Sequence, residues 1–108
     1  MKRDAESFMS ASALEVSRHL GALVRQGRLA RQWTIAELAE RARVGTATVK
    51  RIEKGAPSVS LGVWLSLFEC LALLPLLKRL EDPAAAALLN DTRAKRARRK
   101  ASSADLDF

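Results

Sequence analysis

Three polar side chains at alternate positions, Thr46, Thr48 and Lys50, have the chemistry needed to recognise the bases of nucleic acid. Hydroxyl and ammonium groups can hydrogen-bond the base edges that a major groove displays. Nearby cations could neutralise phosphates, which positions a protein on a duplex without reading its sequence. The candidate phosphate contacts are Arg28, Arg31, Arg43, Arg51 and Lys54. These residue types predict a nucleic-acid interface of base-reading and phosphate-binding side chains.

Other kinds of chemistry have little support in the sequence. We find no Ser/His/acid set, no glycine-rich phosphate loop and no carboxylate pair suited to a cleft, so we do not expect an enzyme or a cofactor. His19 is the single histidine and lacks partners at metal-ligand spacing, which argues against a metal site. Cys70 lies among apolar residues and is expected to be an inert small hydrophobe.

The base-reading candidates require a short helix, and the preceding residues predict a helix before it. Thr34 is the expected N-cap of a helix over residues 35–42, because Glu37 stands three residues later in a capping-box pattern. A break at residues 43–45 would then turn the chain. This first helix can support the second one from behind.

The second helix is predicted over residues 46–54. Val49 and Ile52 lie three residues apart and share its inner face, while the polar candidates occupy the outer face. Gly55 stands where a left-handed residue commonly ends a helix. Two short helices joined by a tight turn form a helix-turn-helix, which places its second helix on base edges.

The residues at these positions resemble the Cro/repressor-type, or Xre-like, helix-turn-helix family. The resemblance covers about residues 16–72, and its motif is Thr34, Glu37-Leu38-Ala39, Val44, Thr48-Val49 and Arg51-Ile52-Glu53-Lys54-Gly55. The resemblance implies an all-α fold, with a five-helix repressor-type domain and a C-terminal helical and basic extension. It also implies a homodimer on a palindromic operator of double-stranded DNA.

Three positions depart from the family pattern. Ile35 stands where the family often has a phosphate-binding Gln, and Arg43 stands where it usually has Gly. Gly45 replaces a Ser N-cap and should cap less well by a few tenths of a kcal/mol. These departures affect individual contacts and leave the predicted fold in place.

Positive charge is concentrated in two regions. The 108-residue chain has a formal net charge of +7, and residues 93–100 contribute six cations and no acid. Residues 16–71 carry a net charge of +5. Both regions suit phosphate binding, and the alternative for residues 93–100 is a solubilising run on a frayed helix.

The sequence also gives expectations about the cellular compartment. No early apolar run resembles a secretory signal, and the longest apolar stretch, residues 70–77, is too short to span a bilayer. A single cysteine suits a reducing compartment. We therefore expect a soluble cytoplasmic protein that does not associate with membranes.

A long helix over residues 13–32 is expected to precede the helix-turn-helix. Ser12 and Glu15 form a second capping-box pattern at its start. Residues 1–11 should be a mobile N-terminus. The predicted inner stripe of the long helix consists of Val16, Leu20, Leu23, Val24 and Gly27. Trp33 should staple onto the first turn of the next helix.

A fourth helix is expected over residues 61–71, with Ser60 as its N-cap. Its predicted inner stripe follows helical spacing at Leu61, Trp64, Leu65, Phe68 and Leu71 or Ala72. This helix should close the core over the helix-turn-helix.

Leucines near residues 73–80 exceed what a small closed core needs. They should form a fifth helix with Pro75 near its start and bury part of their surface against a second copy, unless they only cap their own core. The predicted dimerisation residues are Leu73, Leu74, Leu76, Leu77 and Leu80. The domain containing the helix-turn-helix should therefore extend over residues 12–81.

Residues 82–108 form the predicted extension. Asp82 and Pro83 look like an N-cap and first helical residue, followed by a helix over residues 84–100 that frays at its far end. The remaining residues, 101–108, should be disordered when alone. Their last three, residues 106–108, could form a docking peptide.

These features support two functional hypotheses, a DNA-binding transcriptional repressor and a protein-neutralising antitoxin, and a single chain could combine both. Beyond residue 55 the chain is similar to HipB-like antitoxins, which implies a HipA-like kinase toxin as partner and autoregulation of a shared operon. The alternative is a stand-alone phage- or host-type transcriptional repressor without a toxin partner. The product of a neighbouring gene would distinguish the two.

Overall fold

A computed structural model describes residues 5–105, with side chains described for residues 6–101. The described residues form helices joined by turns and contain no strand, which confirms the predicted all-α class. Its helices are α1 (Ala5–Phe8), α2 (Ala11–Ala30), α3 (Ile35–Ala42), α4 (Thr46–Glu53), α5 (Leu61–Cys70), α6 (Leu74–Lys78) and α7 (Pro83–Asp105). None of the described helices is both long and apolar enough to cross a membrane.

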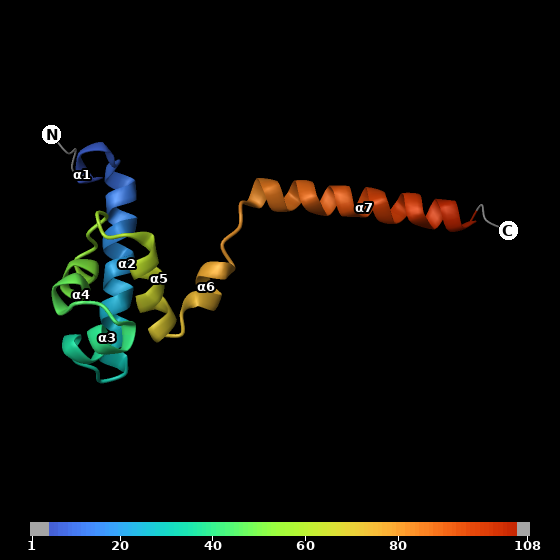
Figure 1. Cartoon of the computed structure of the whole chain (residues 1–108). Helices are drawn as coiled ribbons and strands as arrows, with labels where there is room; N and C mark the ends of the chain where they lie inside the picture. Colours follow the sequence, from blue (N-terminus) through green and yellow to red (C-terminus); the bar gives the residue numbers. More distant parts are fainter. Residues whose placement is uncertain (1–4, 106–108) are drawn as a thin grey trace. The chain divides into compact units, whose positions relative to one another are not determined.

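The chain divides into two compact units, residues 1–75 and residues 76–108. In the first unit, α3, α4 and α5 are grouped beside the long helix α2 (Figure 1). The second unit contains the end of α6, a non-helical segment over residues 79–82, and α7.

Helix α2 begins at Ala11, two residues earlier than predicted. Its N-cap is Ser10, whose hydroxyl accepts a hydrogen bond from the Ala13 amide at 3.0 Å. The expected cap at Ser12 was therefore wrong, because Ser10 supplies the same hydroxyl earlier and adds two residues to the helix. The helix also ends sooner, at Ala30, and Gln32 turns the chain with a left-handed φ of 57°.

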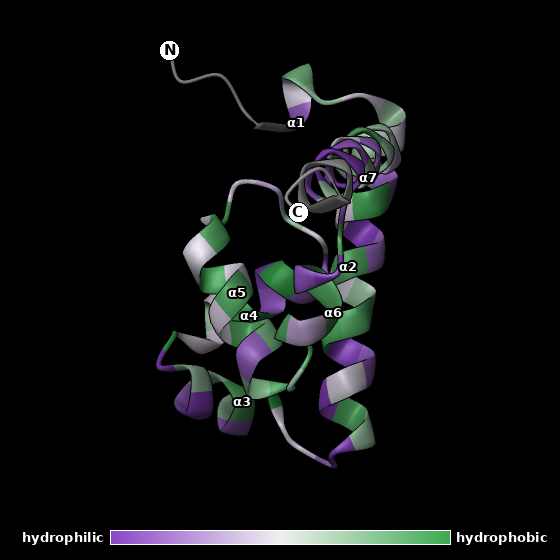
Figure 2. Ribbon diagram, turned by 90° about the vertical axis from the view of Figure 1, so that its right-hand side faces the viewer, coloured by the Kyte–Doolittle hydropathy of each residue, from purple (hydrophilic) through white to green (hydrophobic). Residues whose placement is uncertain are grey.

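The buried face of α2 differs from the predicted apolar stripe. Ser17, Gly21, Val24 and Arg28 are its buried residues, whereas Val16 is 56% exposed. Val24 is buried as predicted, and Leu20, Leu23 and Gly27 are half-buried. Hydrophobic and hydrophilic residues alternate along this helix (Figure 2), so a pattern based on apolar residues alone identified the buried face only in part. The true face accepts Ser and Arg because both side chains have hydrogen-bond partners in the neighbouring α4 region.

Helix α5 supplies much of the core through Trp64, Leu67, Phe68 and Leu71. The Trp64 and Phe68 rings stack with their centroids 6.3 Å apart. Two members of the predicted stripe are outside the core, since Leu61 is 71% exposed and Leu65 is 37% exposed. Trp64, Phe68 and Leu71 are buried as predicted, and Leu67 joins them. Helical periodicity alone could not show that the stripe includes Leu67 and leaves out Leu61 and Leu65.

Both ends of the chain are more helical than predicted. Residues 5–8 form α1, and Met1 to Asp4 lie outside the described residues. Pro83 begins α7, and the Asp82 carboxylate accepts a hydrogen bond from the Ala84 amide at 3.1 Å, as expected of a cap. Helix α7 reaches Asp105, so the expectation of disorder was wrong for residues 101–105. The docking peptide at residues 106–108 lies outside the described part.

Candidate nucleic-acid interface

Helix α3 begins with the predicted capping box. The Thr34 hydroxyl accepts a hydrogen bond from the Glu37 amide at 3.0 Å, and the Thr34 amide donates to the Glu37 carboxylate at 3.3 Å. Two amides that would otherwise lack partners are thereby satisfied. Beside this cap, the Arg41 guanidinium lies 4.3 Å from the centroid of the Trp33 ring. These contacts fix the entry of the chain into the helix-turn-helix.

The turn between α3 and α4 depends on an arginine in a left-handed conformation. Arg43 has φ 58° and ψ 42°, and the following Val44 amide donates to the Ala39 carbonyl at 3.0 Å. A glycine normally adopts this conformation most easily, since it has no Cβ. Arg43 thus occupies the expected turn position and keeps its cation exposed at the surface.

Helix α4 presents opposite faces to the core and to solvent. Val49 and Ile52 are both 0% exposed, as the sequence indicated. Thr46 and Lys50 are exposed and lie one turn apart, so they are neighbours on the outer surface. Thr48 is half-buried and, at 100° per residue, falls on a different flank from them. The structure brings together two of the three predicted base-reading residues.

Two surface hollows adjoin Lys50. One, of about 490 Å³, is lined by residues from α2, from the first turn of α3 and from α4, including Thr34, Ile35 and Thr46. The other, of about 310 Å³, is lined by Arg25, Ile35, Lys50, Glu53 and Lys54. Ile35 lines both hollows at the position where the related family often has Gln. The exposed face of α4 is therefore bordered by concave, cation-bearing surface.

An internal ion pair preserves the positive character of the second hollow. Arg28 Nε lies 2.7 Å from one oxygen of Glu53, and Arg28 Nη2 lies 3.0 Å from the other. The Arg28 Nη1 group also donates to the Trp33 carbonyl at 2.9 Å. The hydrogen bond to Glu53 raises the pKa of Arg28, against the opposing effect of burial. Because its charge is balanced by Arg28, Glu53 opposes Arg25, Lys50 and Lys54 only weakly.

The predicted phosphate-binding residues differ in how exposed their side chains are and in whether their donors already have partners in the protein. Arg28 is only 8% exposed and donates to Glu53 and to the Trp33 carbonyl, so it is not part of the proposed interface. The exposed Arg31 donates to the carbonyls of Gly27 and Leu71 at 2.7 Å and 2.6 Å, which ties the end of α2 to the end of α5. Arg51 is exposed and donates to the Ser58 hydroxyl at 2.7 Å. Lys54 and Arg43 are also exposed.

Two residues of this surface were missed in the sequence. Arg25 lines the hollow with Lys50 and Lys54, although it precedes the helix-turn-helix by many residues. Ala47 is exposed and adjoins Thr46, and its methyl group suits apolar contact with a thymine methyl. Placing Arg25 requires knowing which face of α2 packs against α4, and the apolar pattern identified that face only in part.

The chain offers little alternative chemistry. Burial raises the pKa of Cys70, which disfavours the reactive thiolate. Among the described side chains, no group of three or more His, Cys, Asp or Glu residues could hold a metal ion.

Comparison with known proteins agrees with this geometry. No curated protein and no solved structure matches the chain at the significance required. The family model described as "Helix-turn-helix domain" matches residues 19–80, which is more than half of the chain. This match covers α3, the turn and α4, together with the helices that support them. It supports a DNA-binding regulator, and the chain belongs to this helix-turn-helix domain family.

Proposed function

We propose that this chain is a transcriptional repressor that reads a specific DNA sequence with α4. The observation that carries this proposal is the exposed pair Thr46 and Lys50, opposite the buried Val49 and Ile52 and beside cationic hollows. A helix with this arrangement can enter a major groove while its inner face stays in the core. A repressor of this kind would act in the cytoplasm.

In the proposed interface, one set of residues reads the bases and another set binds the phosphates. Thr46 and Lys50 contact base edges, with Ala47 between them as an apolar contact. The exposed cations outside this patch contact phosphates and set the position of α4 on the duplex. These phosphate contacts are Arg25, Arg43, Arg51 and Lys54, with Arg31 at the periphery.

Paired alanine variants test this division. Lys50→Ala should cost about 1–3 kcal/mol on the preferred sequence and relax the preference at one or two base pairs. Arg25→Ala should instead weaken binding to all duplexes. It should also lower by about one unit the steepness with which the logarithm of the binding constant falls with the logarithm of salt concentration, termed here the salt slope. Fluorescence anisotropy with matched preferred and scrambled duplexes measures both effects. Equal losses on both duplexes for Lys50→Ala would contradict base reading by α4.

We further propose that the repressor is a two-fold homodimer on a palindromic operator. The support is exposed apolar surface near the end of the family match, where Leu76 is 56% exposed and Leu80 is 78% exposed. Leu77 of the same unit is half-buried and adjoins Leu76 in the sequence, and Leu73 and Leu74 of the first unit are half-buried as well. A second copy would cover the leucines and place two α4 helices on successive half-sites.

Sedimentation of a charged variant tests the dimer. Leu76→Glu combined with Leu80→Glu should give monomers that retain the helical circular-dichroism spectrum, since both side chains are exposed. Leu61→Glu is a matched control, because Leu61 is 71% exposed on α5 and lies outside the proposed surface. A wild-type protein that sediments as a monomer at micromolar concentration, alone and on DNA, would exclude the dimer.

A second candidate function is neutralisation of a HipA-like kinase toxin. The observation favouring it is that residues 76–108 form a separate unit with further exposed leucines, Leu88 at 67% and Leu89 at 57%. Such a surface could bind a protein while α4 remains on DNA. Co-expression with the adjacent gene product provides the test. The antitoxin proposal fails if that product is harmless alone, or stays toxic and unbound beside this chain, and the repressor then stands without a partner.

A further inference from the structure

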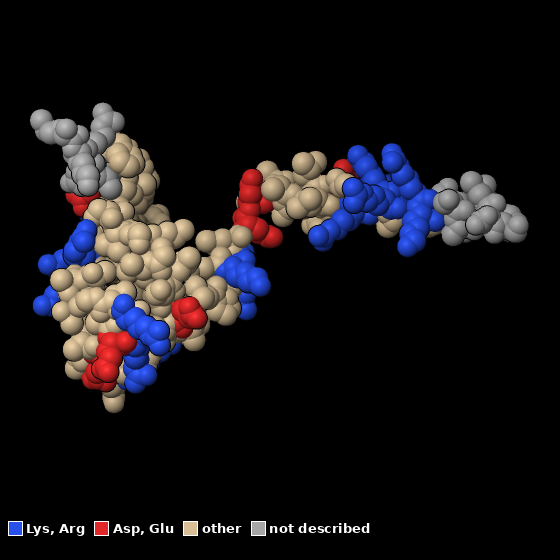
Figure 3. Space-filling view, viewed as in Figure 1, with Lys and Arg blue, Asp and Glu red and all other residues tan. Residues whose placement is uncertain are grey.

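We propose that residues 93–100 of α7, termed here the basic segment, form a second DNA-binding element that holds phosphates without reading sequence. This inference rests on the proposed function of α4 and extends it to a part of the chain outside the helix-turn-helix match. The basic segment holds six Lys or Arg residues and no acid, whereas the rest of the chain has a net charge of only +1. Lys and Arg atoms gather over this half of α7 (Figure 3).

The charges in the basic segment are largely free of local compensation. Lys95 forms an ion pair with Asp91 at 3.2 Å, but these side chains are 66% and 57% exposed, so the pair contributes little. Like charges also recur at i,i+3 and i,i+4, as between Arg96 and both Arg99 and Lys100. Such pairs destabilise a helix, and a bound polyanion would remove that repulsion.

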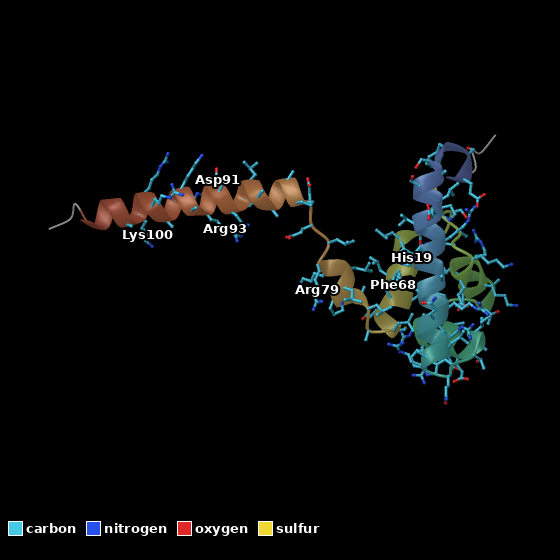
Figure 4. All side chains as sticks on the ribbon, turned by 180° about the vertical axis from the view of Figure 1, so that it is seen from behind. His19, Phe68, Arg79, Asp91, Arg93 and Lys100 are labelled. Atoms are coloured by element: carbon cyan, nitrogen blue, oxygen red, sulfur yellow. The ribbon has the colours of Figure 1, made fainter. Side chains whose placement is uncertain are left out.

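The helical geometry spreads these cations widely around the axis. At 100° per residue, the six cations occupy an arc of about 220°, and the basic segment is about 10 Å long. Figure 4 shows charged side chains on both sides of the α7 ribbon, with Arg93 and Lys100 on one side and Asp91 on the other. A B-DNA major groove is about 12 Å wide, so one helix of this kind can contact phosphates of both strands.

The remaining arc indicates why the partner is DNA and not a membrane or a protein. It is occupied by Ala94, Ala97 and Ala101, and the large apolar residues of α7, Leu88 and Leu89, precede the basic segment. A surface-bound amphipathic helix needs a large apolar face for the acyl chains. A stable protein interface needs a buried apolar or aromatic centre. The basic segment instead offers cations of the kind that a regular array of phosphates attracts.

Covalent linkage makes this second contact effective. Once α4 is on a duplex, the basic segment of the same chain experiences neighbouring phosphates at a high effective concentration. Its contacts should therefore strengthen binding to any duplex, including the preferred one. The base preference should still be set by Thr46 and Lys50.

Salt-dependent binding of the full chain to a 30-base-pair duplex of scrambled sequence tests the inference. In the test variant the six cations of the basic segment are replaced by Gln, which retains helix propensity. In the matched control only its four arginines become Lys, as in Arg93→Lys, so the charge is kept. Each phosphate contact contributes about 0.9 units to the salt slope. Loss of three to six contacts should therefore lower the salt slope of the Gln variant by about 3–5 units per chain. The Lys control should keep the wild-type slope to within about one unit.

Circular dichroism provides a second readout. The α-helical circular-dichroism signal of the wild-type protein should increase or stay the same when duplex DNA is added, because bound phosphates relieve the repulsion between the cations of α7. An unchanged slope in the Gln variant would overturn the inference. Tighter wild-type binding to single-stranded RNA of equal length, lost in the Gln variant, would also overturn it in favour of RNA.

A third protein separates this inference from the proposed function of α4. Thr46→Ala combined with Lys50→Ala should lose sequence preference and lower the salt slope on scrambled DNA by no more than about one unit, since one cation is removed. If this protein keeps its full sequence preference while the Gln variant has a lower salt slope, the proposal that α4 reads bases is contradicted and DNA binding by the basic segment is supported. If it loses its sequence preference while the Gln variant keeps the wild-type salt slope, DNA binding by the basic segment is contradicted and base reading by α4 is supported.

Discussion

At the scale of single residues, the position of α4 depends on small side chains that allow close backbone approach. The Ser17 hydroxyl donates to the Gly55 carbonyl at 2.6 Å, and Gly55 has a left-handed φ of 80°. A Cβ at Gly21 would lie 2.4 Å from the Ile52 carbonyl oxygen. The sequence alone could not identify the backbone that approaches Gly21, because that depends on where α4 ends in space.

Gly21→Ala should lower the free energy of unfolding by about 1–3 kcal/mol or more, because the new methyl group meets backbone that cannot easily move. Gly62→Ala is the matched control within α5, where a Cβ would meet nothing within 4 Å. That control should be stabilised by up to about 1 kcal/mol through helix propensity. Urea unfolding measures both. Equal stability of the two variants would show that the crossing of α2 and α4 is looser than described.

Arg43→Gly should stabilise the fold and weaken DNA binding at the same time. Removing the Cβ from a left-handed residue should raise the free energy of unfolding by about 1 kcal/mol. Loss of one proposed phosphate contact should lower the salt slope by about one unit. Ala72→Gly is a control, since Ala72 has the same φ of 58° after α5 and lies outside the proposed interface. The strain account fails if neither glycine variant melts higher than wild type.

At the scale of helices, one buried ion pair joins the supporting helix to the proposed recognition helix. Arg28 and Glu53 have side chains 9% and 7% exposed, and Arg28 also holds the Trp33 carbonyl ahead of α3. This arrangement connects α2, α4 and the approach to α3 through one guanidinium. The sequence placed Arg28 among the phosphate contacts, because an arginine's burial cannot be seen without the fold around it.

Breaking this pair should be costly, and replacing both partners should be much less so. Glu53→Gln leaves the Arg28 charge buried without its counter-ion and should cost about 3 kcal/mol. Arg28→Met combined with Glu53→Met should lie within about 2 kcal/mol of wild type, because neither charge then needs a partner. A double-mutant cycle by chemical unfolding measures the coupling. Additive losses from the two single variants would contradict a direct interaction.

The helices also show how far sequence reasoning could go. Helix α3, the turn at Arg43 and the start of α4 were predicted to the residue, since caps and turn residues act locally. The start of α2 was missed because Ser10 and Ser12 both satisfy the capping chemistry. The buried faces of α2 and α5 were predicted only in part, since Val24, Trp64 and Phe68 are buried as expected but Val16, Leu61 and Leu65 are exposed. Periodicity allows neighbouring stripes, and only tertiary packing selects one of them.

At the scale of the whole molecule, we propose that residues 1–75 read the DNA sequence and that residues 76–108 supply further contacts. The helix-turn-helix match and the geometry of α4 support the first assignment. The exposed leucines and the basic segment motivate the second. Neither phosphate binding nor dimerisation would by itself distinguish one DNA sequence from another, so the central claim concerns α4.

Selection of preferred duplexes from a randomised pool by the full chain tests that claim most directly. The wild-type protein should enrich one motif with two-fold symmetry, bound about 10³-fold or more tightly than scrambled duplex. The Thr46→Ala and Lys50→Ala double variant should lose most of that ratio, with a much smaller loss of affinity for scrambled DNA from the one missing cation. Failure of the wild type to enrich any motif, or equal enrichment by the double variant, would contradict sequence reading by α4.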